Sequence, residues 1–345
     1  MNRCVTSRFY TFVLVILWIA GVVVGPSAYA DQLADSLLAS AIVRLDARGV
    51  EISIKRGANV KAALRHPDAP SVTRYPVELA LNALADRDDP TAANKAEKIL
   101  RLLFAKGATL RGRPDELFTV VADGHERILK LLLEQGANPH VRLYGYLPSE
   151  LAIKYQQEHL LPILLARGLP KVSPEEVIQI RFVDAASRQD KAGMERTLEE
   201  GAAVNGIDAA GNLALVEYLS VPLTTAEDYE NLMWLLAQGA DPSKGELNEE
   251  QTSPLHRLIE RSYRKADFEF TAKLTALFLE KGAEVSAEDY RGMTPLHYTA
   301  EKGNVPVANV LLANNAKCAS RDKLGRSPYD LAKSGDMIAL LRSCK

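Results

Sequence analysis

The sequence predicts an all-α repeat solenoid of stacked helix-turn-helix units joined by short β-turn fingers. Two observations predict it. A leucine-rich stretch that ends in Gly-Ala or a close variant recurs along the chain. An Asp-x-x-Gly turn, followed by Thr or Ser, Pro and an apolar residue, returns between those stretches. Self-similarity at a period of about 20–50 residues is typical of repeat architectures.

The first pattern marks the end of the second helix in each unit. The intervals between successive turn residues are 50, 29, 32, 33, 38, 43 and 33 residues. Most cluster near 33, and the longer ones indicate a unit that carries an insertion. Gly or Asn in a left-handed conformation is a common stop for a helix. The turn residues are Gly57, Gly107, Gly136, Gly168, Gly201, Gly239, Gly282 and Asn315.

The second pattern is clearest in residues 289–296. Asp289 and Gly292 are expected to make the turn of a finger. Thr294 is expected to cap the first helix, and Pro295 to occupy its first position, where no hydrogen bond is lost. A turn near Gly303 would then lead into a second helix over residues 305–313.

Copies of this second pattern differ in quality. Residues 322–329 repeat it with Ser in place of Thr, and residues 208–215 form a weaker copy. Residues 252–256, TSPLH, keep its second part without the Asp-Gly lead. The apolar residues that follow each copy predict a stripe buried against the neighbouring units.

Residues 289–318, DYRGMTPLHYTAEKGNVPVANVLLANNAKC, resemble the ankyrin repeat at nearly every structural position. The resemblance extends over residues 31–345, with eight full units and a truncated closing unit over residues 325–345. It implies a body of paired helices, with fingers projecting along one edge. It also implies that the concave surface made by the fingers and the first helices binds another protein.

The first thirty residues are predicted to be a signal peptide. They have a basic start, an uncharged apolar run over residues 12–24 and a small-x-small site at residues 28–30. The alternative is an uncleaved anchor, but the thirteen-residue run is short of the roughly 20 residues that a spanning helix needs. The chain is therefore expected to be exported and periplasmic or secreted, with no membrane span after cleavage.

Charge argues against a nucleic-acid partner. Removing residues 1–30 takes away Arg3 and Arg8, which leaves 40 basic and 44 acidic residues and a net charge of −4. The chain has no run of Lys and Arg and no interleaving of aromatic with basic residues, whereas phosphate binding needs a concentrated positive footprint.

Two cysteines, Cys318 and Cys344, remain after the expected cleavage. In an oxidising compartment they favour one disulfide, which would close the C-terminal end and add roughly 3 kcal/mol in the chain-entropy model. The alternative is two unrelated small apolar side chains.

The repeat pattern is interrupted in several places. Residues 85–97, 220–231 and 261–273 lengthen the link between the two helices of their units, and residues 243–252 lengthen a finger. The first three fall at the same place in their units and are expected to share one edge of the stack. Such insertions often form a binding face, but they are also tolerated in surface loops.

Residues 169–181 indicate either an extended finger or a mild break between two halves of the solenoid. In both interpretations Ser173 is expected to cap the next helix, with help from Glu175 and Glu176.

Catalysis is not indicated. The sequence has no zinc-type Cys pairing, no phosphate-binding Gly loop and no nucleophile elbow. Asp289, Thr294 and His297 lie within nine residues, yet the repeat pattern gives each a structural role. His256 and His297 hold equivalent positions and are expected to hydrogen-bond backbone across the stack. No catalytic, cofactor-binding or metal-binding residue is predicted.

The sequence therefore favours an exported protein-interaction module, in the form of an inhibitor, immunity-type or regulatory protein of the periplasm or envelope. The alternative is a structural, assembly or stress-resistance protein of the envelope with no single tight target. Tyr and Arg dominate binding hot spots. The partner-binding candidates near finger tips are Tyr144, Tyr146, Tyr290, Arg291, Lys323 and Arg326. The oligomeric state and the identity of the partner do not follow from the sequence.

Overall fold

The computed structural model describes residues 26–85, 91–113, 115–262 and 264–343. The chain divides into two compact units, unit 1 over residues 1–141 and unit 2 over residues 142–345. The apolar run of the predicted signal peptide lies outside the described residues. The expected cleavage site lies inside the first described helix, which begins at Pro26. In the part of the chain that is described, no helix has the length and apolarity to cross a membrane.

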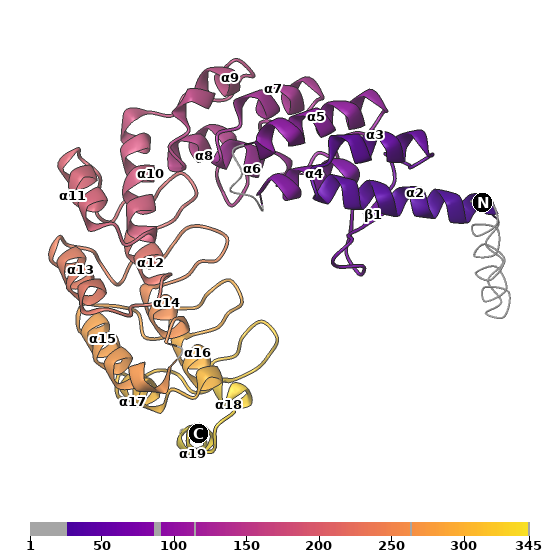
Figure 1. Cartoon of the computed structure of the whole chain (residues 1–345). Coiled ribbons are helices and arrows are strands. Elements are labelled where there is room, and N and C mark those ends of the chain that lie inside the picture. The colour runs from indigo at the N-terminus through magenta and orange to yellow at the C-terminus, as the bar shows by residue number, and fades with distance from the viewer. Residues whose placement is uncertain (1–25, 86–90, 114, 263, 344–345) are drawn as a thin grey trace, which may run out of the picture. The chain divides into compact units, whose positions relative to one another are not determined.

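Unit 1 consists of helix pairs and one short hairpin (Figure 1). Each first helix packs on its own second helix and on the first helix of the next pair: α2 on α3 and α4, and α4 on α5 and α6. The elements are α2 Pro26–Val43, α3 Ala47–Lys55, β1 Leu64–Arg65, β2 Thr73–Arg74, α4 Pro76–Ala85, α5 Ala92–Ala105, α6 Asp115–Ala122 and α7 Glu126–Glu134. Strands β1 and β2 are antiparallel, with Leu64 opposite Arg74.

Unit 2, taken by itself, is also built of helix pairs (Figure 1). The elements are α8 Pro148–Lys154, η1 Glu158–Leu160, α9 Leu161–Leu165, α10 Pro174–Ser187, α11 Lys191–Glu199, α12 Ala214–Leu219, α13 Ala226–Ala237, α14 Pro254–Glu260, η2 Lys265–Asp267, α15 Phe268–Glu280, α16 Pro295–Lys302, α17 Val305–Ala313, α18 Pro328–Leu331 and α19 Gly335–Arg342. The predicted all-α repeat solenoid is confirmed.

The turns that end the second helices are formed as predicted. All seven glycines of the first pattern have positive φ angles, between 83° and 108°, and Asn315 has a φ of 66°. Helix α17 has the predicted bounds, and Gly303 ends helix α16 with a φ of 69°. A residue with a side chain rarely adopts this conformation, so the glycines mark where the chain reverses.

Two histidines each form a hydrogen bond to the backbone of the next repeat, as the sequence predicted. The Nε2 of His256 donates to the carbonyl of Met293 at 2.9 Å, and the Nε2 of His297 donates to the carbonyl of Arg326 at 3.0 Å. Each acceptor lies at the start of the next repeat. The Nδ1 atom of His297 is hydrogen-bonded to the hydroxyl of Thr294 at 2.9 Å. The ring therefore joins its own helix start to the following finger.

The core of unit 2 is shared between repeats. One cluster of buried side chains draws on helices α10 to α15, and a second draws on helices α14 to α19. Leu279 packs against both clusters. Phe182, Tyr218 and Phe278 are among the largest fully buried side chains. No helix pair supplies the whole of either cluster, as expected of a repeat array.

The insertions are partly helical, which corrects the sequence interpretation. Helix α13 begins at Ala226 and helix α15 at Phe268, so the second half of residues 220–231 and of residues 261–273 belongs to a helix. Thr225 starts α13 early because it forms a capping box with Asp228. In the third insertion, residues 86–90 lie outside the described residues.

The predicted break at residues 169–181 lies inside unit 2, where helices α8 and α10 are in contact. Ser173 caps α10 as predicted, accepting a hydrogen bond from the Glu176 amide at 3.2 Å. Cys318 is disulfide-bonded. Because Cys344 lies outside the described residues, its pairing with Cys318 stays a prediction.

Stability is expected to fall in mild acid because of His256. Burial lowers the pKa of this ring to about 4, below the ordinary value of about 6.5. Between pH 6.5 and pH 4 the unfolded chain therefore binds a proton that the folded chain excludes, and the free energy of unfolding declines as the pH falls.

The variant His256→Gln is expected to be less stable than the wild type at pH 7, because the bond to Met293 is altered. Below pH 6.5 the free energy of unfolding of the variant should fall less steeply with pH than that of the wild type, by up to about 1.4 kcal/mol per pH unit. Urea unfolding at pH 6.5, 5.5 and 4.5 measures both. If the free energies of unfolding of the two proteins changed in parallel with pH, His256 would not contribute to the pH dependence of stability.

Candidate functional site

The loops that precede the first helices of unit 2 form a row of fingers on one side of that unit (Figure 1). We call fingers the residues 142–147, 206–213, 245–252, 288–294 and 321–327, which lead into α8, α12, α14, α16 and α18. The side chain of an aspartate organises three of them. The Oδ1 of Asp289 accepts hydrogen bonds from the amides of Arg291 and Met293, both at 2.8 Å.

Asp322 and Asp208 make the same turn. The Oδ1 of Asp322 accepts from the amides of Leu324 and Arg326, and that of Asp208 accepts from the amides of Ala210 and Asn212. The sequence interpretation of Asp-x-x-Gly as a finger turn is therefore confirmed. Hydrogen bonds to the carboxylates of Asp289 and Asp322 hold their pKa values below the ordinary range although desolvation opposes this.

The finger at residues 245–252 has a related turn built on an asparagine, which the sequence interpretation missed. The Oδ1 of Asn248 accepts from the amides of Glu250 and Gln251 at 3.0 and 3.1 Å. Asn and Asp side chains both bond the backbone two residues on. Asn248 was therefore a usable signal within the longer finger.

Backbone hydrogen bonds tie neighbouring fingers together. The amide of Leu247 donates to the carbonyl of Gly211 at 2.9 Å, and that of Tyr290 to the carbonyl of Glu250 at 3.1 Å. The amide of Lys323 donates to the carbonyl of Arg291 at 2.8 Å. A Cβ added at Gly211 would lie 2.8 Å from the backbone of Leu247. Because the backbones are this close, the four fingers from residues 206–213 to residues 321–327 form one continuous face.

Each finger presents one exposed apolar side chain. We call these five residues the finger-tip row, and their exposed fractions range from 40% to 78%. A row of this kind is unusual for a surface, where single apolar residues are normally scattered. The row consists of Tyr144, Ile207, Leu247, Tyr290 and Leu324.

Tyr144 stands out in this row because its backbone is in a conformation that suits glycine. It has a φ of 50° and is followed by Gly145 with a φ of 82°, so the two residues form the tight hairpin turn between Leu143 and Tyr146. A bulky residue at positive φ costs of order 1 kcal/mol or more and is often kept for function.

The predicted candidates fall into three groups. Tyr144 and Tyr290 lie in the finger-tip row, and Lys323 is exposed beside it. Arg291 and Arg326 are each just under half exposed, but their guanidinium groups are paired with Asp289 and Asp322 of their own fingers. These two arginines therefore stabilise the turns through ion pairs and are also partly exposed to solvent.

The structure corrects the predicted position of Tyr146. We expected it at the surface, but its side chain is only 3% exposed and its hydroxyl donates to the carboxylate of Asp208 in the next finger. The hydroxyl also accepts from the Nδ2 of Asn212 at 2.8 Å. Burial beside Asp208 raises the pKa of Tyr146. Tyr146 therefore ties two fingers together and is not available to a partner.

A buried carboxyl group lies under the fingers. Glu246 is only 3% exposed, and among the described residues neither of its oxygens has a hydrogen bond of ordinary geometry. Desolvation first, and then the carboxylate of Glu217, raise its pKa to about 8, although Asn248, Arg257 and the Leu213 amide oppose this. Glu246 is therefore mainly protonated at neutral pH.

The three residues whose types and spacing suggest catalysis have structural roles. Thr294 and His297 hold the start of α16, and Asp289 holds a finger, so these three residues make no catalytic triad. Within the described ranges, no group of three or more His, Cys, Asp or Glu residues is placed to hold a metal ion.

Comparison with known proteins agrees with this geometry. Residues 279–332 match the family model "Ankyrin repeats (many copies)". Over these residues the chain is similar to ankyrin repeats. Members of this family typically act as non-catalytic modules for protein–protein interaction, so the match supports a binding module.

Several curated proteins are similar over part of their length. The Caenorhabditis elegans "Ankyrin repeat and LEM domain-containing protein 1 homolog" is 48% identical over 67 residues, which cover 19% of this chain and 9% of that protein. The human "Mitochondrial disaggregase" is 26% identical over 187 residues, which cover 47% of this chain and 26% of that protein.

The Arabidopsis thaliana "Potassium channel GORK" is 34% identical over 84 residues, which cover 24% of this chain and 10% of that protein. The chain therefore spans less than a third of the length of each of these relatives.

Replacing Tyr144 by Asn is expected to stabilise unit 2 by about 0.5–1 kcal/mol, because Asn tolerates a positive φ better than Tyr does. Thermal and urea unfolding measure the change, with Tyr290→Asn as the control on a neighbouring finger. An unchanged or lower stability of Tyr144→Asn would show that the tyrosine side chain contributes more to folding than its backbone costs.

Glu246→Gln is expected to stabilise the protein most at high pH. The folded chain keeps a proton on Glu246 up to about pH 8, whereas the unfolded chain releases it near pH 4.5. The free energy of unfolding of the wild type should therefore fall as the pH rises between these values, and the amide variant should lack this component. Unfolding at pH 5, 6.5 and 8 checks this, with Glu249→Gln on the exposed part of the same finger as control. A constant difference between Glu246→Gln and wild type across this range would contradict it.

Proposed function

We propose that this chain is an exported protein-binding module that holds a partner protein with the finger-tip row of unit 2. The observation that carries the proposal is the row itself: one exposed apolar side chain on each of five fingers. Protein interfaces have an apolar, aromatic-rich centre with a polar rim, and Lys323, Arg291 and Arg326 supply such a rim beside Tyr290 and Leu324.

The ties between the fingers support the same proposal. The backbone bonds between consecutive fingers and the bond from Tyr146 to Asp208 hold the row in place before a partner arrives. A preformed surface loses less conformational entropy on binding, so more of the contact energy appears as affinity.

The place of action that we propose is the periplasm or the cell envelope. The support is the N-terminal sequence, with its basic start, apolar run and small-x-small site. The bonded state of Cys318 is consistent with an oxidising compartment.

Within this proposal the bound partner is inhibited or regulated, as by an immunity-type protein. The competing role is structural support of the envelope without one tight target. Recovery of a partner on the mature protein from a native envelope extract separates them. Recovery of one protein at a fixed stoichiometry supports recognition. Recovery of many proteins, none of them stoichiometric, would contradict the proposal. Assay of that partner's activity, alone and in the complex, tests inhibition.

The finger-tip row is tested by charge substitutions. The double variant Leu247→Arg with Leu324→Arg is expected to weaken the partner's affinity at least tenfold, because it places two charges in the apolar centre of the contact. The matched control is Met233→Arg, since Met233 is 46% exposed on helix α13, outside the fingers. Calorimetry or surface plasmon resonance gives the affinities. Equal affinities for the double variant and the wild type would show that the partner binds elsewhere.

A further inference from the structure

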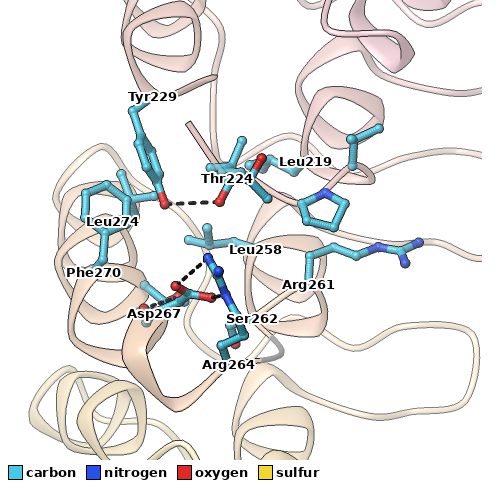
Figure 2. A pocket seen from close by; sticks show the side chains of 14 residues that line it. Leu219, Thr224, Tyr229, Leu258, Arg261, Ser262, Arg264, Asp267, Phe270 and Leu274 are labelled. Carbon is cyan, nitrogen blue, oxygen red and sulfur yellow. Dashed lines mark hydrogen bonds and ion pairs between the residues drawn. The ribbon is translucent and has the colours of Figure 1, made fainter. Parts of the chain in front are cut away.

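A cavity lies between the two inserted loops of unit 2, away from the fingers (Figure 2). Leu219, residues 221–224 and Tyr229 form one wall, and side chains that include Leu258, Phe270 and Leu274 form the other. The sequence placed both insertions at the same position in their repeats, and the shared cavity confirms that these two lie side by side. The repeat pattern itself contains neither loop, so this cavity depends on the insertions.

The cavity is large enough for a small molecule and mostly apolar. Its volume is about 290 Å³. An apolar cavity of about 150 Å³ is already enough to bind benzene in an engineered protein. Leu258 and Leu274, both buried in the core, contribute to its lining. The rings of Tyr229 and Phe270 contact each other, with centroids 3.9 Å apart, and present aromatic surface beside them.

The polar side chains of the lining are largely occupied with partners of their own. The hydroxyl of Tyr229 donates to the Leu223 carbonyl at 3.2 Å, that of Ser262 to the Ile259 carbonyl at 2.8 Å, and that of Thr271 to the Asp267 carbonyl at 2.9 Å. These hydroxyl donors are therefore satisfied before any ligand arrives. A guest gains little from these hydroxyl groups.

Two charged side chains of the lining, Arg264 and Asp267, pair with each other. Arg264 makes two hydrogen bonds to the carboxylate of Asp267, at 2.9 and 3.1 Å. Figure 2 shows the guanidinium group of Arg261 pointing away from Tyr229 and Phe270. An anionic guest would have to break the Arg264–Asp267 pair or give up its hydration without a matching cation.

We propose that this cavity is a binding site for a neutral aromatic molecule of one or two fused rings. Its volume admits a bicyclic ring system, and its walls offer leucine and aromatic surface for contact. The inference does not rest on the finger-tip row, because none of the lining residues belongs to a finger.

Indole is the probe for this site, and indole-3-acetate is its charged counterpart. Titration of the full chain with each, followed by saturation-transfer NMR and calorimetry, should show saturable binding of one indole per chain. Indole-3-acetate should bind at least tenfold more weakly, because its carboxylate would have to lose its hydration or displace Asp267 from Arg264.

Substitutions at Leu223 locate the site. Leu223 is half-buried in the loop wall, so Leu223→Arg should weaken indole binding at least tenfold by placing a charge in the cavity. Leu223→Trp should weaken it also, because its own indole ring competes for the space, and this variant keeps the test open if the first one folds poorly. Leu247→Arg, the same exchange at a finger tip, should bind indole like the wild type.

The expected pattern is indole binding that is lost in both Leu223 variants and kept in Leu247→Arg. Three results would overturn the proposal: no saturable binding to the wild type, equal binding by folded Leu223 variants, or loss of binding in Leu247→Arg alone. Tighter binding of indole-3-acetate than of indole would overturn the assignment of a neutral ligand. Partner binding measured on the same Leu247→Arg protein reports on the finger-tip row separately.

Discussion

A single pair of short helices cannot bury its own apolar face, and the rest of unit 2 depends on that constraint. Both core clusters are assembled from several consecutive helix pairs, and Leu279 packs against the two of them. Each repeat is therefore stable only against its neighbours. The left-handed turns after the second helices, and the histidines that bond the next repeat's backbone, set the distance at which one pair meets the next.

The same constraint explains where the surface chemistry lies. Because the helices bury their apolar faces against each other, the finger-tip row and the cavity both lie in the fingers and the inter-helix loops. The fingers hold their shape through side chains such as Asp289 and Asp322, each of which binds two backbone amides of its own loop. The inserted loops are instead closed by capping at Thr225 and by the pair between Arg264 and Asp267. One edge of the unit thus carries a preformed face and another carries a cavity.

Much of the fold could be predicted from the sequence because its signals are local. Gly282, Asp289 and Pro295 each act within a few residues, and a helix stop, a finger turn and a helix start follow from them. The site was less predictable. Tyr144 and Tyr146 differ by two positions and looked equivalent, but only contact with Asp208 of another finger decides that Tyr146 is buried. The raised pKa of Glu246 likewise depends on its burial and, second, on Glu217, which belongs to the preceding repeat.

The exposed leucines were missed for a different reason. Leucine is a residue type that is usually buried, so Leu247 and Leu324 resemble core residues in the sequence. Only their position in the turn places them at a finger tip. The cavity between the insertions depends on how two loops 41 residues apart, counted from Ser220 to Arg261, approach each other. Spacing along the chain places both loops on one edge, but it does not give the volume between them.

The serial linking of the fingers has a kinetic consequence. A partner that lies along the row touches several tips that are joined by backbone hydrogen bonds. Once one tip is engaged, the others are held at a high effective concentration near their targets, so several weak contacts act multivalently. A single tip can then release and rebind without loss of the complex. Dissociation requires all of them to open together, and a long residence time can follow from contacts that are individually weak.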